Sequence, residues 1–183
     1  MRQFIGAILF AASATLGCIV PSTSVAQPLR LEITDGVIEP LPFALPTFIS
    51  ETSNAGEMAQ QISGLVADDL RGTGLFRQIQ PEAFISQISA FGAPVQYPDW
   101  RAINAQALIT GAVSVSGNGR VTVKFRLYDV FTGSELGQGL QFVGTTDGWR
   151  RIAHKVADEV YARITGEGPY FDSRVVFFGE TGP

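Results

Sequence analysis

The sequence is poor in the side chains that most often perform catalysis or bind metals. Its 183 residues include one cysteine and one histidine. One cysteine cannot form a disulfide framework or a thiolate metal site. The glycine-containing stretches 72–74 and 117–119 lack the spacing, the lysine and the hydroxyl that cradle phosphates, and no serine lies in a nucleophile-elbow context. These absences argue against an enzyme and predict no cofactor and no bound metal.

Long apolar runs are also scarce, and the one extended run lies near the N-terminus. Phe4–Leu16 is almost uninterrupted in its apolar character, Arg2 precedes it, and Ser24–Ala26 follows as a small-x-small cleavage sequence. The run is shorter than the roughly 20 residues that a helix needs to span a bilayer. Residues 1–26 are therefore predicted to be a cleavable signal peptide that directs the chain to the periplasm, without direct membrane insertion.

Cys18 offers a competing interpretation, because a lipid-modified cysteine after a signal sequence would anchor the chain to a membrane. Thr15 stands where a leucine-like residue is usual, three positions before such a cysteine. This difference favours cleavage after Ala26. The cleaved product would contain no cysteine, and its stability would depend on the hydrophobic core alone.

Charge and length narrow the class of protein further. Without residues 1–26, 12 basic and 17 acidic side chains remain, a net charge of about −5 with the histidine neutral. A mildly acidic protein is a poor candidate for nucleic-acid binding, which depends on neutralising phosphates. The remaining length is sufficient for one domain with its own core.

A short strand-like segment follows the predicted cleavage site. Leu29, Leu31 and Ile33 alternate with polar residues, and Asp35-Gly36 is a turn signal. The prolines between residues 28 and 46 limit any hydrogen-bonded ladder in this part of the chain. We expect residues 27–42 to form an extended arm that can pair with a sheet edge. An ordinary edge strand of the domain is the alternative.

The next part of the chain, residues 43–168, has the periodicities of a single α/β domain. Gly117-Asn118-Gly119 predicts a tight hairpin turn, and Gly166 predicts the end of the last helix. Ser53 or Asn54, Asp99 and Asp147 are candidate N-caps. The pattern predicts a mixed sheet with helices packed on one face, built from strands at 43–49, 75–79, 107–116, 121–127 and 135–144 and from helices at 54–72, 82–88, 99–103 and 149–164.

The histidine and the adjacent pairs of acidic residues do not have the spacing of a catalytic site. His154 precedes Asp158 by four residues, which predicts a one-turn surface pair rather than a catalytic base. The neighbouring carboxylates Asp68-Asp69 and Asp158-Glu159 point in different directions on a helix, so they cannot flank one bond. Solvated helix faces are the expected arrangement for both pairs.

Several stretches resemble the TolB family of periplasmic proteins of the Tol-Pal system. The most specific stretch is Ala67–Phe76, at the end of the first helix. The others occur in the same order as in that family: Leu29–Val37, Trp100, Ala107–Gly111, Val123–Asp129, Trp149-Arg150, Asp158–Val160 and Ile164–Gly166. The resemblance covers residues 29–183 and implies an N-terminal α/β domain followed by a β-propeller. Residues 169–183 then correspond to a linker and the first propeller strand, within the apolar run Ser173–Gly179, with nearly all of the propeller missing.

The resemblance also implies a partner and a site. In the family, the segment after the cleavage site binds the C-terminal domain of TolA, whereas the lipoprotein Pal contacts the propeller and is expected only for a full-length protein. The chain is thus expected to be a non-catalytic interaction protein that supports outer-membrane integrity and constriction during division. A periplasmic binding module for a small molecule or glycan is the alternative. The TolA-binding residues implied are Leu29, Arg30, Leu31, Glu32, Ile33, Thr34, Asp35, Gly36 and Val37.

Overall fold

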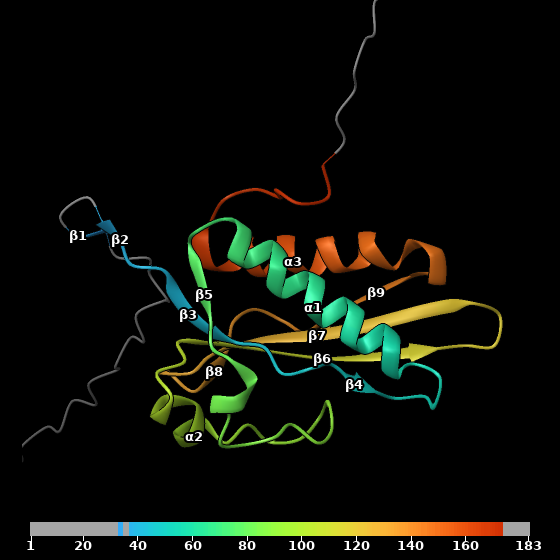
Figure 1. Cartoon of the computed structure of the whole chain (residues 1–183), viewed down its shortest axis with the longest axis horizontal. Coiled ribbons are helices and arrows are strands. Elements are labelled where there is room, and N and C mark those ends of the chain that lie inside the picture. Colours follow the sequence, from blue (N-terminus) through green and yellow to red (C-terminus); the bar gives the residue numbers. More distant parts are fainter. Residues whose placement is uncertain (1–32, 35–36, 174–183) are drawn as a thin grey trace, which may run out of the picture.

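The computed structural model describes residues 33–34 and 37–173, which contain one main sheet, a small two-stranded sheet and three α-helices (Figure 1). The predicted signal peptide and the predicted strand after Ser173 lie outside the described residues. The helices are α1 (Gly56–Gly72), α2 (Tyr97–Ala102) and α3 (Trp149–Thr165). The strands of the main sheet are β3 (Leu41–Ala44), β4 (Ile49–Ser50), β5 (Phe76–Gln78), β6 (Ala107–Val115), β7 (Arg120–Asp129), β8 (Ser134–Glu135) and β9 (Leu140–Thr145).

The main sheet is mixed, as the sequence predicts. Its strands lie in the order β5-β3-β6-β7-β8, with β4 also beside β6 and β9 also beside β7. The pairs β3–β5, β3–β6 and β4–β6 are parallel, and the pairs that involve β7 are antiparallel. The predicted hairpin at Gly117–Gly119 joins β6 to β7, and Gly119 has the positive φ of 76° that such a turn requires.

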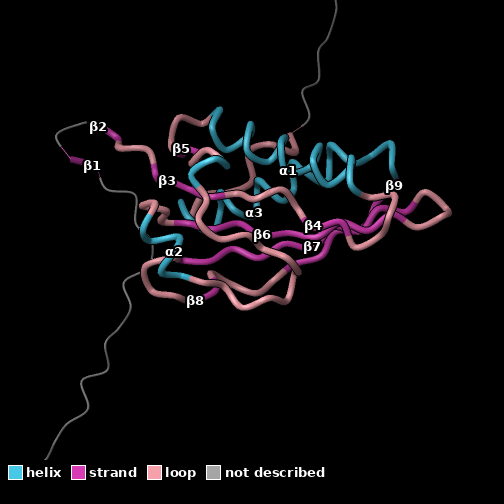
Figure 2. The backbone as a smooth tube through the Cα atoms, turned by 60° about the horizontal axis from the view of Figure 1, so that its bottom comes forward, coloured by secondary structure: helices cyan, strands magenta, loops and turns pink. Residues whose placement is uncertain are grey.

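Two long amphipathic helices cover one face of the sheet. Both α1 and α3 lie on the same side of the strands in Figures 1 and 2, and they pack against each other. Apolar residues that recur every three or four positions form their buried faces. The core between helices and sheet includes Phe43, Ile62, Val66, Leu70, Val113, Val121, Val123, Phe125, Leu127, Val156 and Val160, and each of these side chains is fully buried.

The opposite face of the sheet has a cover of its own, which does not follow from the local pattern of the sequence. Trp100 on α2 is fully buried and contacts the ring of Phe84, with 5.2 Å between ring centroids. Together with Leu108, Tyr128 and Val130 they belong to a second apolar cluster on this side. Figure 1 shows α2 on the other side of the strands from α1 and α3. The helices therefore do not cover one face alone, because α2 and the loop before it cover part of the other.

Several predicted element boundaries were wrong. The strand expected at 43–49 is divided into β3 and β4, and Phe48 between them is buried in the core. The helix expected at 82–88 is only a 3₁₀ turn, Pro81–Ala83, and α2 starts at Tyr97 rather than after Asp99. The strand expected at 135–144 divides into β8 and β9. The main sheet begins at Leu41, so two residues assigned to the arm belong to β3.

Two predicted helix caps were also wrong, while the predicted helix end was confirmed. The N-cap of α1 is Ala55 rather than Ser53 or Asn54, and the N-cap of α3 is Gly148, after a 3₁₀ turn at Thr146–Gly148 that contains Asp147. Neither helix has a side-chain cap. Gly166 ends α3 with a φ of 78°, and its N–H donates to the Ala162 carbonyl. This left-handed conformation favours glycine.

Candidate functional site

The predicted arm forms a small antiparallel pair where it is described. Strands β1 (Ile33–Thr34) and β2 (Val37–Ile38) pair with Ile33 opposite Ile38 and Thr34 opposite Val37. This register places two residues at the connection, in agreement with the turn signal at 35–36. The predicted site residues Leu29, Arg30, Leu31, Glu32, Asp35 and Gly36 lie outside the described residues.

The arm leads directly into a strand in the interior of the sheet. Only Glu39 and Pro40 separate β2 from β3, which has β5 on one side and β6 on the other. The amide of Leu41 donates to the Leu75 carbonyl, at 2.9 Å between N and O. Figure 1 shows β1 and β2 projecting beyond the end of β3. The described part of the arm is thus extended backbone attached to a well-anchored strand.

His154 pairs with a different carboxylate from the one that the sequence suggests. Its Nδ1 lies 2.7 Å from Oδ2 of Asp69, so the pair connects α3 to α1. The Asp69 side chain is only 13% exposed. Burial raises the pKa of the Asp69 carboxyl above its usual value, although the hydrogen bond to His154 acts in the opposite direction. The predicted surface pair of His154 with Asp158 was therefore wrong, since only the packing of the two helices determines this contact.

Asp158 is buried and accepts hydrogen bonds from the chain that follows α3. Its Oδ1 accepts from the amides of Tyr170 and Phe171, both at 2.6 Å, and its Oδ2 accepts from the amide of Asp172 at 3.0 Å. The prediction of a solvated helix face was wrong for Asp69 and Asp158. The sequence offers little indication that Asp158 is buried, because nothing in the neighbouring residues distinguishes it from the more exposed Glu159.

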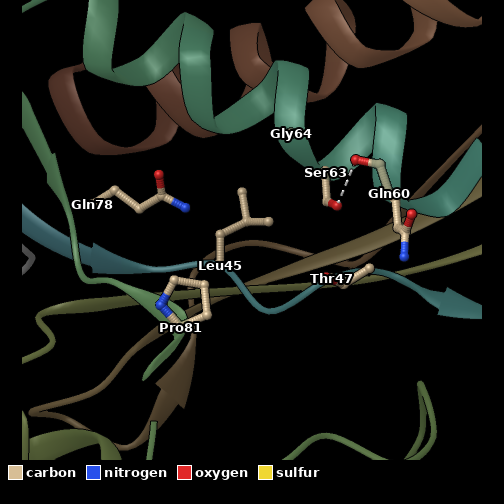
Figure 3. A pocket seen from close by; sticks show the side chains of 7 residues that line it. All are labelled: Leu45, Thr47, Gln60, Ser63, Gly64, Gln78 and Pro81. Carbon is tan, nitrogen blue, oxygen red and sulfur yellow. Dashed lines mark hydrogen bonds between the residues drawn. The ribbon is translucent and has the colours of Figure 1, made fainter. Parts of the chain in front are cut away.

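A small surface pocket lies between α1 and the β5 end of the sheet (Figure 3). Its volume is about 190 Å³. The Ser63 hydroxyl on its wall donates to the Ala59 carbonyl of its own helix, at 2.8 Å, so this group is already engaged. The lining residues are Leu45, Thr47, Gln60, Ser63, Gly64, Gln78 and Pro81, none of which carries a charge. The pocket offers amide and hydroxyl groups, but no charged group for catalysis.

The described part of the chain contains neither a cluster of metal ligands nor a membrane-spanning helix. In residues 33–34 and 37–173, no three histidine, cysteine, aspartate or glutamate side chains are grouped so that they could hold a metal ion. Over the same residues, no helix combines the length and the apolar character that crossing a bilayer demands.

Fold and arm together define the class: an α/β domain with an extended segment attached to an interior strand of its sheet. A family model described as the TolB amino-terminal domain matches residues 29–136. The chain therefore belongs to the TolB family.

Curated relatives carry the name of this family, and a solved structure shares the fold. The chain is 70% identical over 155 residues to the "Tol-Pal system protein TolB" of Roseobacter denitrificans, covering 85% of this chain and 35% of the relative. It is 60% identical over 186 residues to the protein of that name in Ruegeria sp., covering 100% of this chain and 41% of the relative. The chain thus spans well under half the length of these relatives. The crystal structure of TolB from Acinetobacter baumannii superposes with a TM-score of 0.58 at 21% identity, covering 73% of this chain and 30% of that one, which shows a shared fold.

Proposed function

We propose that this chain is a non-catalytic periplasmic component of the Tol-Pal system that binds the C-terminal domain of TolA through the arm Leu29–Val37. Membership of the TolB family supports a role in that system. The wider role follows from the resemblance: support of outer-membrane integrity and of constriction during division. Export by a signal peptide at residues 1–26 belongs to the same proposal. Contact with Pal is expected only where a propeller is present.

The observation that carries the proposal is the weak self-pairing of the arm. Among the described residues, β1 and β2 contribute two residues each, and these residues pair with one another. An isolated two-stranded hairpin is marginal in water. Exchange of this pairing for a longer ladder with a partner strand would therefore cost little. Main-chain hydrogen bonds would provide affinity, and alternate side chains would provide specificity.

The arm sequence assigns separate roles to its side chains. Leu31 and Ile33 would fill apolar pockets on TolA, because alternate residues of an added strand face the same side. Arg30, Glu32 and Asp35 would match charges on the partner, which affects the association rate and the choice of partner.

Deletion of residues 27–36 tests the proposal. We expect binding to the TolA C-terminal domain to be lost in isothermal titration calorimetry while the thermal midpoint of the domain is unchanged, because the sheet begins at Leu41. Double substitution of Leu31 and Ile33 by Asp should also abolish binding. The matched control is Ile85→Asp, at a side chain that is 61% exposed on the loop before α2. Unchanged affinity after the deletion would refute the proposal.

The pocket in Figure 3 favours a second candidate function, a binding module for a small molecule or glycan. Its uncharged amide and hydroxyl groups beside Leu45 and Pro81 suit a neutral polar ligand. A thermal-shift series with cell-wall fragments tests it. Stabilisation that disappears in Gln60→Ala would favour this function, and no stabilisation would exclude it.

A further inference from the structure

The chain turns back along α3 after the helix ends. The positive φ of Gly166 redirects it, and Gly168 and Pro169 complete the turn. Asp172 then lies beside Arg151, two turns of helix before the position of Asp158. Figure 1 shows this segment running above α3. Residues 170–172 therefore run back along α3, with contacts to Tyr161, Asp158 and Arg151.

One carboxylate provides the main-chain anchoring of this segment. Three successive amides, those of Tyr170, Phe171 and Asp172, converge on Asp158 at 2.6, 2.6 and 3.0 Å. Successive amides that point to one anion form an anion-binding nest, and hydrogen bonds to a charged acceptor are stronger than neutral ones. Asp158 is only 6% exposed, so these bonds are shielded from water.

Other contacts of the segment are made by side chains. The rings of Tyr170 and Phe171 lie 6.0 and 5.9 Å from the ring of Tyr161, between centroids. The Arg151 Nε donates to both carboxylate oxygens of Asp172, at 3.1 and 3.0 Å, but the Arg151 side chain is 56% exposed, which weakens the pair. Within the described part of the chain, no backbone carbonyl accepts from residues 170–172. Phe171 also packs against the main core. The main-chain anchoring of the segment thus depends on a single buried carboxylate, while its rings add apolar contact.

The geometry points to Asp158 as a latch that holds residues 170–172 on α3 and so fixes where the chain leaves the domain. Release of the latch would free the segment up to the Gly166 turn and uncover the ring of Tyr161, which contacts Tyr170 and Phe171. Asp158 acts as a positioning residue and touches no ligand. The latch lies near the C-terminal end of the domain and the arm lies before its first strand, so a test of the latch does not depend on TolA binding.

Amide hydrogen exchange of the full chain, measured by NMR, tests the latch. In Asp158→Asn, one oxygen becomes an NH₂ group that opposes a backbone donor. We expect exchange at Tyr170, Phe171 and Asp172 to accelerate by about tenfold or more, because one hydrogen bond to a charged group corresponds to at least that factor. Exchange in β6 and β7 should stay at the wild-type rate. Chymotrypsin should also cleave faster after Tyr170 and Phe171.

The control is Glu159→Gln, the same chemical change at the next position. Glu159 is 42% exposed, and its one ion pair among the described residues is with Arg163, so the exchange of residues 170–172 should not change. Unchanged exchange in Asp158→Asn would overturn the latch, and so would equal acceleration in β6 and β7, which would show a general structural role. If Asp158→Asn fails to fold, Tyr170→Pro decides, with Tyr170→Ala as its control, because both variants lose the Tyr170 ring and only the proline also loses the amide donor. Exchange at Phe171 and Asp172 that is faster in the proline variant than in the alanine variant would support the latch, and equal exchange would overturn it.

Discussion

Gly111, in the middle of β6, provides a sharp test of how the core is packed. A Cβ atom built at this position would lie 2.7 Å from three ring atoms of Phe48. Ordinary van der Waals contact begins near 3.4 Å, so the ring would have to move by several tenths of an ångström. Phe48 is only 3% exposed and lies on the helix-covered face, where its neighbours restrict such a movement. Gly111→Ala therefore overpacks the core.

The size of the effect follows from two opposing terms. Overpacking a close-packed core costs about 1–3 kcal/mol. Replacing glycine by alanine lowers the entropy of the unfolded chain, which returns about 0.4–1 kcal/mol where the backbone tolerates the change. Gly111 has no positive φ, so the backbone adds no further penalty. We expect the free energy of unfolding to fall by about 1–2 kcal/mol, or by a few degrees in the thermal midpoint.

Urea denaturation followed by circular dichroism measures this change, with the slope of the transition as a check that both proteins unfold in the same way. Gly64→Ala is the matched control. Gly64 lies in α1, nothing would approach its Cβ within 4 Å, and alanine is favoured in a helix by about 1 kcal/mol. The same substitution should thus have opposite signs at the two positions. Phe48→Leu should restore part of the loss in Gly111→Ala. Equal or greater stability of Gly111→Ala would refute the packing argument.

Two further predictions concern α1. Asp69 has a raised pKa in the folded protein, so its contribution to stability is fully present below the unfolded value of about 3.8 and is lost as pH rises through the folded value. The free energy of unfolding of the wild type should therefore fall relative to that of Asp69→Asn as the pH rises above about 3.8. Urea titrations at several pH values measure this difference. They are repeated in the His154→Gln background, which removes the paired histidine, while Asp68 and Asp158 are the other charges near Asp69. A difference that is independent of pH would contradict this. Ile62→Ala should lower the free energy of unfolding by about 2–5 kcal/mol, because Ile62 is fully buried, whereas the exposed neighbour Gln61→Ala should change it by less than about 0.5 kcal/mol. Similar effects at both positions would show that the buried face of α1 is misassigned.

The sequence predicted the elements whose signals are local. Both α1 and α3 follow from apolar residues at helical spacing, and the hairpin of β6 and β7 follows from Gly117–Gly119 between alternating strands. The TolB family and the mixed α/β sheet were confirmed on the same basis. These elements could be predicted because the apolar residues that form the buried face of a helix or strand are spaced regularly within that one element.

Local pattern failed where distant contacts determine the conformation. The run 43–49 reads as one strand, yet Phe48 enters the core above Gly111 and divides it into β3 and β4. Residues 84–88 carry apolar side chains that suit a helix, but Phe84 packs on Trp100 from an irregular segment. In both cases, burial of an aromatic ring outweighs the local preference of the backbone.

The candidate functional residues also divide into those with a local signal in the sequence and those whose contacts depend on tertiary packing. The pairing of β1 with β2 is consistent with the strand alternation and the turn signal of one short segment. The bounds of the arm stay a prediction, and its role in partner binding stays a proposal. Asp158 could not be predicted, because its three donors come from residues 12 to 14 positions later. The pair of His154 with Asp69 joins residues 85 positions apart.

The sequence by itself determined the family, the two long helices, the main hairpin and the absence of cysteine and histidine clusters, because these depend on residue identity and short-range spacing. Only the tertiary structure decided which carboxylates are buried, which histidine contact forms and how the chain leaves α3. Those features arise where two elements pack together. Packing brings into contact side chains that are far apart in the sequence, so no local spacing predicts the contact.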